Sequence, residues 1–292
     1  MKLNLHIQFP KIFCNFNCSY CFQRKHYLPT ETQKKTVEKK YKLYLTYLNN
    51  LYNKSSYNSC VLTLLGGEIT LYDLNYIFSA LKSEKKIILK IMTNLAKDIS
   101  YYKNLFENNK NLDFLFNVSY HKEFLNFDVY KKKMLEISSF GFENLKKIKT
   151  SLVISNSTPL ELINDLKDFS YKTGFSLRFI TQENKAKMVK LKDEYKQFYE
   201  VKKIKRKKIN EITKKMYEEN QVYNLKDSIC IPEFTIDESG EIRPECNTYW
   251  PNPKKYIFSI NSLEELLNKK MVCTVNRCPC LNFIYNSLND ND

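Results

Sequence analysis

The chain has 292 residues, of which 43% are hydrophobic and 14% aromatic, enough apolar side chains for a sizeable core. Only 5 glycines and 8 prolines exclude a collagen-like or low-complexity architecture. We find no run of about 18 apolar residues that would span a membrane. The polar amino-terminal stretch is not typical of a secretory signal. These features predict a soluble, cytoplasmic globular protein.

The charge is strongly basic, because 47 Lys and Arg residues against 32 Asp and Glu residues give a formal net charge of +15. A basic surface attracts nucleic acids, anionic membranes and acidic substrates. An AT-rich genome gives the same excess, since the codons of lysine, asparagine, isoleucine and tyrosine are AT-rich. The 9 cysteines, in a chain without an export signal, indicate metal ligands or catalytic thiols rather than disulfides.

Short apolar runs alternate along the chain with stretches of helical periodicity. The predicted strands are Leu3–Phe9, Val61–Leu65, Ile87–Thr93, Asp113–Ser119, Lys147–Ser155 and Phe175–Thr181. The predicted helices are 30–52, 71–83, 98–109, 124–140, 158–173 and 190–201. One face of the first helix carries Val37, Tyr41, Tyr44, Leu45, Leu48 and Leu51. Strands and helices in alternation predict an α/β fold with a parallel sheet.

The first group of cysteines follows the first predicted strand. Cys14, Cys18 and Cys21 form a C-x3-C-x2-C loop. Three thiolates at this spacing can hold three irons of a cubane [4Fe–4S] cluster and leave the fourth iron without a protein ligand. A structural zinc site is the alternative. Such a site closes with four ligands, and His26 is the nearest candidate for the fourth.

This loop resembles the C-x3-C-x-aromatic-C signature of the radical S-adenosylmethionine (radical SAM) superfamily, with Tyr20 in the aromatic position. Gly66-Gly67-Glu68, directly after the second predicted strand, resembles the family's Gly-Gly-Glu motif. The resemblance implies a partial (βα)6 TIM-like barrel, with S-adenosylmethionine bound to the open iron of the [4Fe–4S] cluster. One electron from the reduced cluster would cleave S-adenosylmethionine to a 5′-deoxyadenosyl radical, which abstracts hydrogen from a substrate.

The same resemblance implies roles for these residues in cofactor binding. Gly66 and Gly67 would let the backbone approach the methionine moiety. Glu68 would accept a hydrogen bond from the ammonium group of the cofactor. The backbone around Tyr20 would bind the adenine amine.

In such barrels the site lies at the carboxyl ends of the strands, and alternate side chains face the lumen. Polar side chains of one parity recur on the predicted strands: Asn4, His6 and Gln8; Lys90, Met92 and Asn94; Asn117, Ser119 and His121; Lys149 and Ser151; and Arg178. We expect Ser119 and Asn94 to contact the ribose, and Arg178 or Lys149 the carboxylate of the cofactor. His121 and His6 are candidates for substrate contact. Each of these residues is alternatively a satisfied polar group of an α/β interior, and we expect Cys60 to be a small core residue.

The composition changes after residue 201. The segment 202–226 opens with a basic run in which Glu211 is the one acidic residue up to position 215. Such a run is typical of a solvated helix or linker. The alternative is a docking strip for an acidic peptide or a nucleic-acid backbone.

Five cysteines lie in the last segment: Cys230, Cys246, Cys273, Cys278 and Cys280. A predicted β-hairpin at 234–243 separates the first two. The arrangement resembles the auxiliary cluster domains called SPASM and Twitch, with fewer cysteines than the full SPASM set. The resemblance implies one auxiliary [4Fe–4S] cluster on Cys230, Cys246, Cys278 and either Cys280 or Cys273. A structural zinc on four of these thiolates is the alternative.

We therefore expect a radical SAM partial barrel at 1–201, a basic linker or helix at 202–226 and an auxiliary cluster domain at 227–292. The family resemblance implies an oxidoreductase whose substrate is a peptide or protein residue, changed by oxidation, cross-linking or epimerisation. Because only 13 residues precede Cys14, we expect no fused amino-terminal recognition domain, so a peptide would need a separate recognition protein or the basic run.

Three alternatives stay open for the function. The first is a dehydrogenase of a small alcohol or sugar-derived metabolite. The second is a tRNA-modifying protein, which the net charge of +15 suggests, although few aromatic residues interleave the basic run. The third is a non-enzymatic scaffold that carries the cluster. The expected partners are the substrate and a low-potential electron donor of the flavodoxin or ferredoxin type, with no membrane.

Overall fold

The computed structural model describes residues 2–21, 26–181, 183–184, 187–188, 195, 233–237, 239, 241–244 and 258–259. The chain divides into two compact units, Met1–Lys192 and Asp193–Asp292. A parallel sheet forms the centre of the first unit, and an antiparallel hairpin lies in the second.

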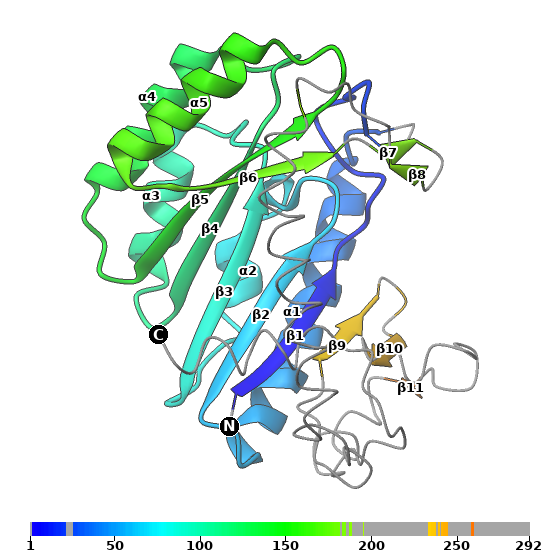
Figure 1. The fold of residues 1–292 in the computed structure, drawn as a ribbon. Coiled ribbons are helices and arrows are strands. Elements are labelled where there is room, and N and C mark those ends of the chain that lie inside the picture. Colours follow the sequence, from blue (N-terminus) through cyan, green and yellow to red (C-terminus); the bar gives the residue numbers. More distant parts are fainter. Residues whose placement is uncertain are drawn as a thin grey trace, which may run out of the picture. The chain divides into compact units, whose positions relative to one another are not determined.

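The sheet of the first unit has parallel strands in chain order, each hydrogen-bonded to the next (Figure 1). The strands are β1 Lys2–Gln8, β2 Ser59–Leu65, β3 Lys86–Thr93, β4 Asp113–Tyr120, β5 Leu145–Ile154 and β6 Ser176–Thr181. Each predicted strand overlaps one of these, which confirms the predicted α/β class. The sheet is open rather than closed, as a partial barrel requires. A short hairpin, β7 Glu183–Asn184 with β8 Lys187–Met188, follows β6.

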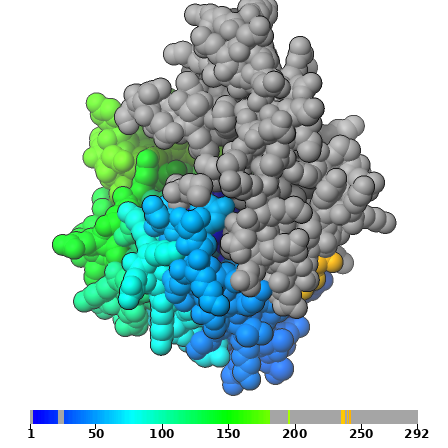
Figure 2. All heavy atoms as spheres, turned by 90° about the horizontal axis from the view of Figure 1, so that it is seen from below, coloured from blue at the N-terminus to red at the C-terminus, as the bar shows by residue number. Residues whose placement is uncertain are grey.

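Helices in the connections cover one face of this sheet (Figure 1). They are α1 Glu31–Lys54, α2 Leu74–Phe78, α3 Ile99–Asn108, α4 Phe127–Ser139 and α5 Leu160–Thr173. Figure 2 shows successive segments side by side in chain order, from blue through cyan to green. None of the helices in the described ranges combines the length and apolar character that a bilayer crossing requires.

The second helix is much shorter than the predicted 71–83. A 3-10 turn, η1 Ile69–Leu71, comes first, and α2 begins only after Asp73. The Asp73 side chain caps α2 by accepting from the Tyr76 N–H at 3.0 Å, and the helix ends at Phe78 with Ser79 as its C-cap. The predicted helix at 190–201 lies outside the described residues, except for Tyr195.

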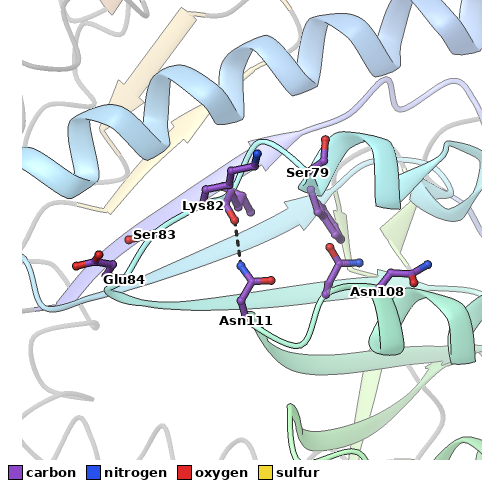
Figure 3. A pocket seen from close by; sticks show the side chains of 9 residues that line it. Ser79, Lys82, Ser83, Glu84, Asn108 and Asn111 are labelled. Carbon is purple, nitrogen blue, oxygen red and sulfur yellow. Dashed lines mark hydrogen bonds between the residues drawn. The ribbon is translucent and has the colours of Figure 1, made fainter.

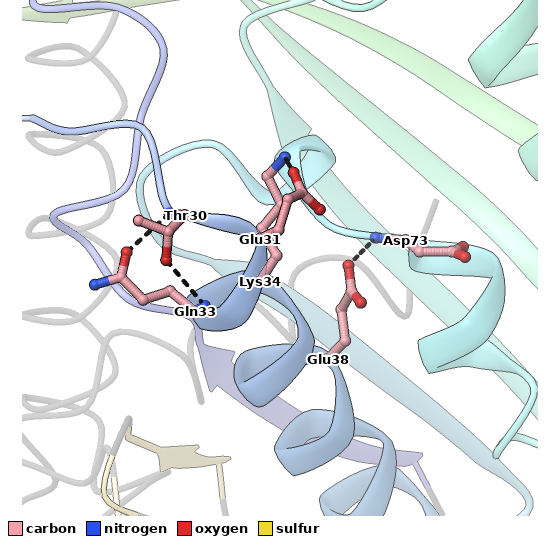
Figure 4. Close-up of polar contacts among 6 residues, drawn as sticks. All are labelled: Thr30, Glu31, Gln33, Lys34, Glu38 and Asp73. Carbon is pink, nitrogen blue, oxygen red and sulfur yellow. Dashed lines mark hydrogen bonds and ion pairs between the residues drawn. The ribbon is translucent and has the colours of Figure 1, made fainter.

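The start of α1 is fixed by a capping box (Figure 4). Thr30 Oγ1 accepts from the Gln33 N–H at 3.2 Å, and Gln33 Oε1 accepts from the Thr30 N–H at 2.9 Å. Glu38 then accepts from the Asp73 N–H at 2.8 Å, which joins α1 to the turn before α2. The predicted apolar face of α1 is buried, which confirms the helical periodicity.

Alternation along the strands separates the two faces of the sheet. One parity packs beneath the helices and includes Ile91, Phe116 and Leu152, each at most 1% exposed. On the same face Tyr130 of α4 donates to Thr150 Oγ1 of β5 at 2.9 Å. Side chains of the other parity point away from the helices and form what we call the inner face. Cys60 is 2% exposed, which confirms it as a core residue.

The described part of the second unit contains the predicted hairpin. Its strands, β9 Glu233–Ile236 and β10 Glu241–Pro244, are antiparallel, and β10 also pairs with β11 Phe258–Ser259. The Asp237 carboxylate closes the turn by accepting from the Ser239 N–H at 2.9 Å and the Glu241 N–H at 3.0 Å. The basic segment and the five carboxy-terminal cysteines lie outside the described residues.

Candidate functional site

A cavity of about 550 Å³ lies at the carboxyl ends of the strands. Cys14, Cys18 and Cys21 line it together with the Gly66-Gly67-Glu68 segment. Tyr20, Asn94, Ser119 and His121 also line it, as do Gln8, Met92, Val153 and Ile180 from the inner face. The fold therefore brings the two motifs, which are far apart in sequence, to one place.

Backbone hydrogen bonds fix the two ends of the cysteine loop. The Cys14 N–H donates to the Tyr27 carbonyl at 3.1 Å, and the Tyr27 N–H donates to the Ile12 carbonyl at 2.9 Å. Within the loop the Cys21 N–H donates to the Cys18 carbonyl at 3.0 Å. The loop is therefore closed at its base, with its thiols directed to the cavity.

The glycines after β2 make room for the segment that leads into this loop. A Cβ atom at Gly67 would lie 2.0 Å from the Phe13 carbonyl oxygen, and one at Gly66 would lie 2.9 Å from Phe9 Cβ. The adjacent Glu68 N–H donates to the same Phe13 carbonyl at 2.9 Å. This contact between two parts of the chain requires glycine whether or not the backbone also approaches a cofactor.

Glu68 is 3% exposed and ties the end of β2 to the end of β3. Its Oε1 accepts from Thr70 N at 3.1 Å, Thr70 Oγ1 at 2.6 Å and Thr93 Oγ1 at 2.8 Å. Its Oε2 accepts from the Asn94 N–H at 2.6 Å. Burial raises the pKa of the Glu68 carboxyl, and these hydrogen bonds oppose that shift. The carboxylate thus fixes Asn94, a role that the sequence alone did not suggest.

Asn94 reaches the cysteine loop from the end of β3. Its Nδ2 donates to Asn15 Oδ1 at 2.8 Å and lies 3.8 Å from Cys14 Sγ. The next residue, Leu95, has a left-handed backbone with φ of 60°, which costs a non-glycine residue about 1–2 kcal/mol. Lys133 of α4 holds this turn by donating to the Leu95 carbonyl at 3.1 Å. A strained backbone conformation of this kind persists only where surrounding contacts hold it in place, as Lys133 does here.

The turn after β4 holds the other side of the loop. The Ser19 N–H donates to Glu123 Oε2 at 2.8 Å, and the Ser19 hydroxyl donates to Glu123 Oε1. The rings of Phe16 and Phe124 stack with centroids 4.7 Å apart. We call this set of contacts the loop clasp. Sequence patterns did not identify Glu123 and Phe124. Their place shortly after the end of β4 is the one signal that could have identified them.

His121 lies at the centre of the loop clasp. Its Nδ1 is 3.1 Å from Cys18 Sγ and 2.9 Å from the Tyr20 hydroxyl. This predicted substrate contact is therefore turned toward the cysteine loop. Burial lowers the pKa of His121 to about 4, so the imidazole is neutral near pH 7.

Burial also dominates the electrostatics of the thiols. It raises the pKa of Cys14 to about 11 and that of Cys18 to about 12. A bound cation reverses this preference, because metal ligation stabilises the thiolate. Thiolates are ligands that suit iron–sulfur clusters and zinc.

The remaining predicted residues are placed differently. Ser119 lines the cavity, and its Oγ lies 3.0 Å from Ser151 Oγ. His26 Nε2 lies 3.1 Å from Cys21 Sγ, so the alternative zinc ligand is beside the loop. Over the described ranges, no three His, Cys, Asp or Glu side chains are grouped to hold a single metal ion. His6, Lys149 and Arg178 are not among the residues that line the cavity.

A second cavity of about 430 Å³ lies near the amino-terminal ends of β3 and β4 (Figure 3). Ser79, Lys82, Glu84 and Asn108 line it, and Asn111 Nδ2 donates to the Leu81 carbonyl at 3.1 Å. None of the predicted site residues is in this lining.

No protein-family model and no curated protein sequence matches the chain. Solved structures do match in fold. The structure of anSMEcpe with bound S-adenosylmethionine and the Cp18Cys peptide has a TM-score of 0.56 and 18% identity, over 92% of this chain and 81% of that one. Streptococcus suis SuiB bound to S-adenosylmethionine has a TM-score of 0.50 and 14% identity, over 97% and 66% of the two chains. Coproporphyrinogen III oxidase (HemN) from Escherichia coli, a radical SAM enzyme, has a TM-score of 0.47 and 11% identity, over 93% and 76%.

The likeness in fold rests on the first two of these structures. The open parallel sheet with its covering helices matches the partial TIM-like barrel of radical SAM enzymes. The predicted fold class is thereby confirmed.

Proposed function

We propose that this chain is a radical SAM enzyme, with a [4Fe–4S] cluster on Cys14, Cys18 and Cys21 and S-adenosylmethionine at the fourth iron. When bound, this pair supplies a 5′-deoxyadenosyl radical, which removes a hydrogen atom from the substrate. The observation that carries the proposal is that the three thiols and Gly66-Gly67-Glu68 line one cavity. The matching folds of two proteins with bound S-adenosylmethionine support it.

The residues present fit such a group. Three thiols from one short loop reach the same cavity, and the Phe16 N–H donates to Cys14 Sγ at 3.4 Å, as it would to a cluster-bound thiolate. The loop clasp and Asn94 hold the loop from two sides, so its thiols are positioned before any metal binds. In this proposal Ser119 and Asn94, which both line the cavity, would contact the ribose, and the backbone near Tyr20 would contact the adenine.

For the substrate we propose a peptide or protein residue. The anSMEcpe structure contains both S-adenosylmethionine and a peptide, in a fold that matches 92% of this chain. In this proposal the chain's own residues exclude water from the reacting atoms and hold the cofactor. A low-potential donor of the flavodoxin or ferredoxin type would deliver the electron.

For the second unit we propose an auxiliary [4Fe–4S] cluster on Cys230, Cys246, Cys278 and either Cys280 or Cys273. The support is the number of cysteines in this short segment and the hairpin β9–β10 between the first two. An auxiliary cluster would accept an electron from the substrate radical or position the substrate.

The test is anaerobic reconstitution of the full chain with iron and sulfide. Two cubanes predict about eight irons per chain, and S-adenosylmethionine with dithionite should release 5′-deoxyadenosine. Replacing Cys14, Cys18 and Cys21 together with alanine should lower iron to about four and abolish cleavage.

Cys60→Ala is the matched control, because Cys60 is a buried core thiol outside the cavity. This variant should keep its iron and its cleavage activity. Wild-type iron content in the triple variant, or zinc in place of iron after purification, would show that the first loop does not hold the proposed cluster.

A further inference from the structure

Basic side chains from three strands gather on the inner face of the sheet, next to the cysteine cavity. Lys90 of β3 lies two residues before Met92, and Arg178 of β6 lies two residues before Ile180. Lys149 of β5 lies four residues before Val153. Because side chains an even number of residues apart share a face of a strand, all three point to the same side as the cavity residues.

The strand register brings these charges close together. Ser151 pairs with Arg178, so Lys149 and Arg178 are diagonal neighbours, about 7–8 Å apart at Cα. Lys149 pairs on its other side with Asn117 of β4, and Asn117 pairs with Met92. Lys90 pairs with Leu115, so it is diagonal to Asn117 and lies two strands from Lys149. Its flexible four-carbon stem can bring its ammonium group nearer to Lys149.

Burial and neighbouring positive charges both disfavour the charged form of Lys149. Burial lowers the pKa of its ammonium group, and the charges of Lys147, Lys90 and Arg178 lower it further. In the part of the chain that the structure describes, the ion pairs include none to Lys90, Lys149 or Arg178. A cluster of like charges without counter-charge is a favourable site for an anion.

Asn117 contributes a second unsatisfied group at the centre of this cluster. Its Oδ1 is buried and makes no hydrogen bond within the described residues. Buried polar atoms are nearly always hydrogen-bonded in folded proteins, so an orphan of this kind indicates a missing partner. A ligand with both an anionic group and a hydrogen-bond donor would satisfy the cations and Asn117 together.

We propose that Lys90, Lys149 and Arg178 form a binding site for an anionic group of the substrate, a carboxylate or a phosphate. As a subsite of a radical SAM enzyme, this inference rests on the proposed function. At about 3.3 Å per strand residue, Arg178 lies about 7 Å and Lys149 about 13 Å along the strands from the cavity residues Ile180 and Val153. The site would thus select a substrate that extends from the cavity along the inner face and carries an anionic group at its far end.

This assignment differs from the sequence expectation that Arg178 or Lys149 binds the carboxylate of the cofactor. Neither residue lines the cavity that contains the three thiols. A substrate that extends from this cavity along the inner face would contact both residues, whereas a cofactor confined to the cavity would not.

The experiment measures anion binding to the full-length reconstituted protein by calorimetry at low salt. Inorganic phosphate and acetate are the two probes. The variants are Lys149→Gln, Arg178→Gln and their combination, and Lys172→Gln is the matched control because Lys172 is exposed on α5. Circular dichroism checks that each variant is folded, and if Lys149→Gln is not, Arg178→Gln and Lys90→Gln carry the test.

We expect wild type and Lys172→Gln to bind one of the probes equally well, and the double variant to bind it at least tenfold more weakly. Tighter binding of phosphate would identify a phosphate group, and tighter binding of acetate a carboxylate. Absence of measurable binding to the wild-type protein, or equal affinities in the double variant and the control, would overturn the proposal.

Release of 5′-deoxyadenosine by the wild-type protein is measured in parallel without either anion. Cleavage of S-adenosylmethionine without any anion binding would refute the anion site and leave the proposed function intact. Anion binding without cleavage, in protein with a full complement of iron, would count against the proposed function instead.

Discussion

Replacing Gly67 with alanine tests whether the Gly-Gly motif holds the cysteine loop in place. The new Cβ would lie 2.0 Å from the Phe13 carbonyl oxygen, 2.8 Å from the Phe13 carbonyl carbon and 2.9 Å from the Lys11 carbonyl oxygen. All three are backbone atoms, and non-bonded contacts are optimal at about 3.5–4.0 Å, so residues 11–13 must move by more than about 1 Å. Overpacking of this kind costs about 1–3 kcal/mol. The movement would also strain the 2.9 Å bond from Glu68 N–H to Phe13 and displace Cys14.

Two assays separate the roles of this glycine. Urea unfolding should show a loss of about 1–3 kcal/mol in the free energy of unfolding. After anaerobic reconstitution without S-adenosylmethionine, Gly67→Ala should hold less iron than the wild-type protein, because its ligand Cys14 is displaced.

Gly141→Ala is the control, since Gly141 has φ of 64° and a Cβ atom added there would meet no other atom within 4 Å. It should lose about 1–2 kcal/mol through backbone strain and keep its iron. Full iron and wild-type stability in Gly67→Ala, with only weaker binding of S-adenosylmethionine, would refute the packing argument. Gly67 would then serve mainly to let the backbone approach the cofactor.

Three further substitutions test the contacts around the site. Glu68→Gln turns an amide donor toward groups that already donate, so we expect a loss of about 1–3 kcal/mol in urea unfolding, and unchanged stability would contradict the network. Glu123→Gln weakens the bonds from Ser19, so a chelator should remove iron several-fold faster, whereas Glu107→Gln on α3 should have no effect. Tyr130→Phe leaves buried Thr150 Oγ1 without its donor, which should cost about 1 kcal/mol, and a loss below the error of the unfolding curve would show that this bond contributes little.

Much of the fold was predictable because its signals are local. Each of β1 to β6 contains apolar residues at every second position, and this alternation fixes which side chains face the helices. The same alternation places Met92 and Ser119 on the face of the cavity, as predicted. The hairpin β9–β10 follows from its turn residues and is confirmed.

The parts that sequence patterns did not predict depend on contacts between distant segments. The helix predicted at 71–83 starts later because Asp73 caps a new start, which Glu38 of α1 holds in place, and it ends at Phe78. Glu123 reaches Ser19 across 104 positions of the chain, which no local pattern can reveal. Two of the four hydrogen bonds on Glu68 likewise come from Thr93 and Asn94, which meet it only after β2 and β3 have paired.

The most direct measurement is the electron paramagnetic resonance spectrum of the reduced, reconstituted protein with and without S-adenosylmethionine. Our account predicts that addition of the cofactor changes the part of the signal that is lost when Cys14, Cys18 and Cys21 are replaced with alanine. A signal from that loop that is identical in the presence and absence of S-adenosylmethionine would contradict the account.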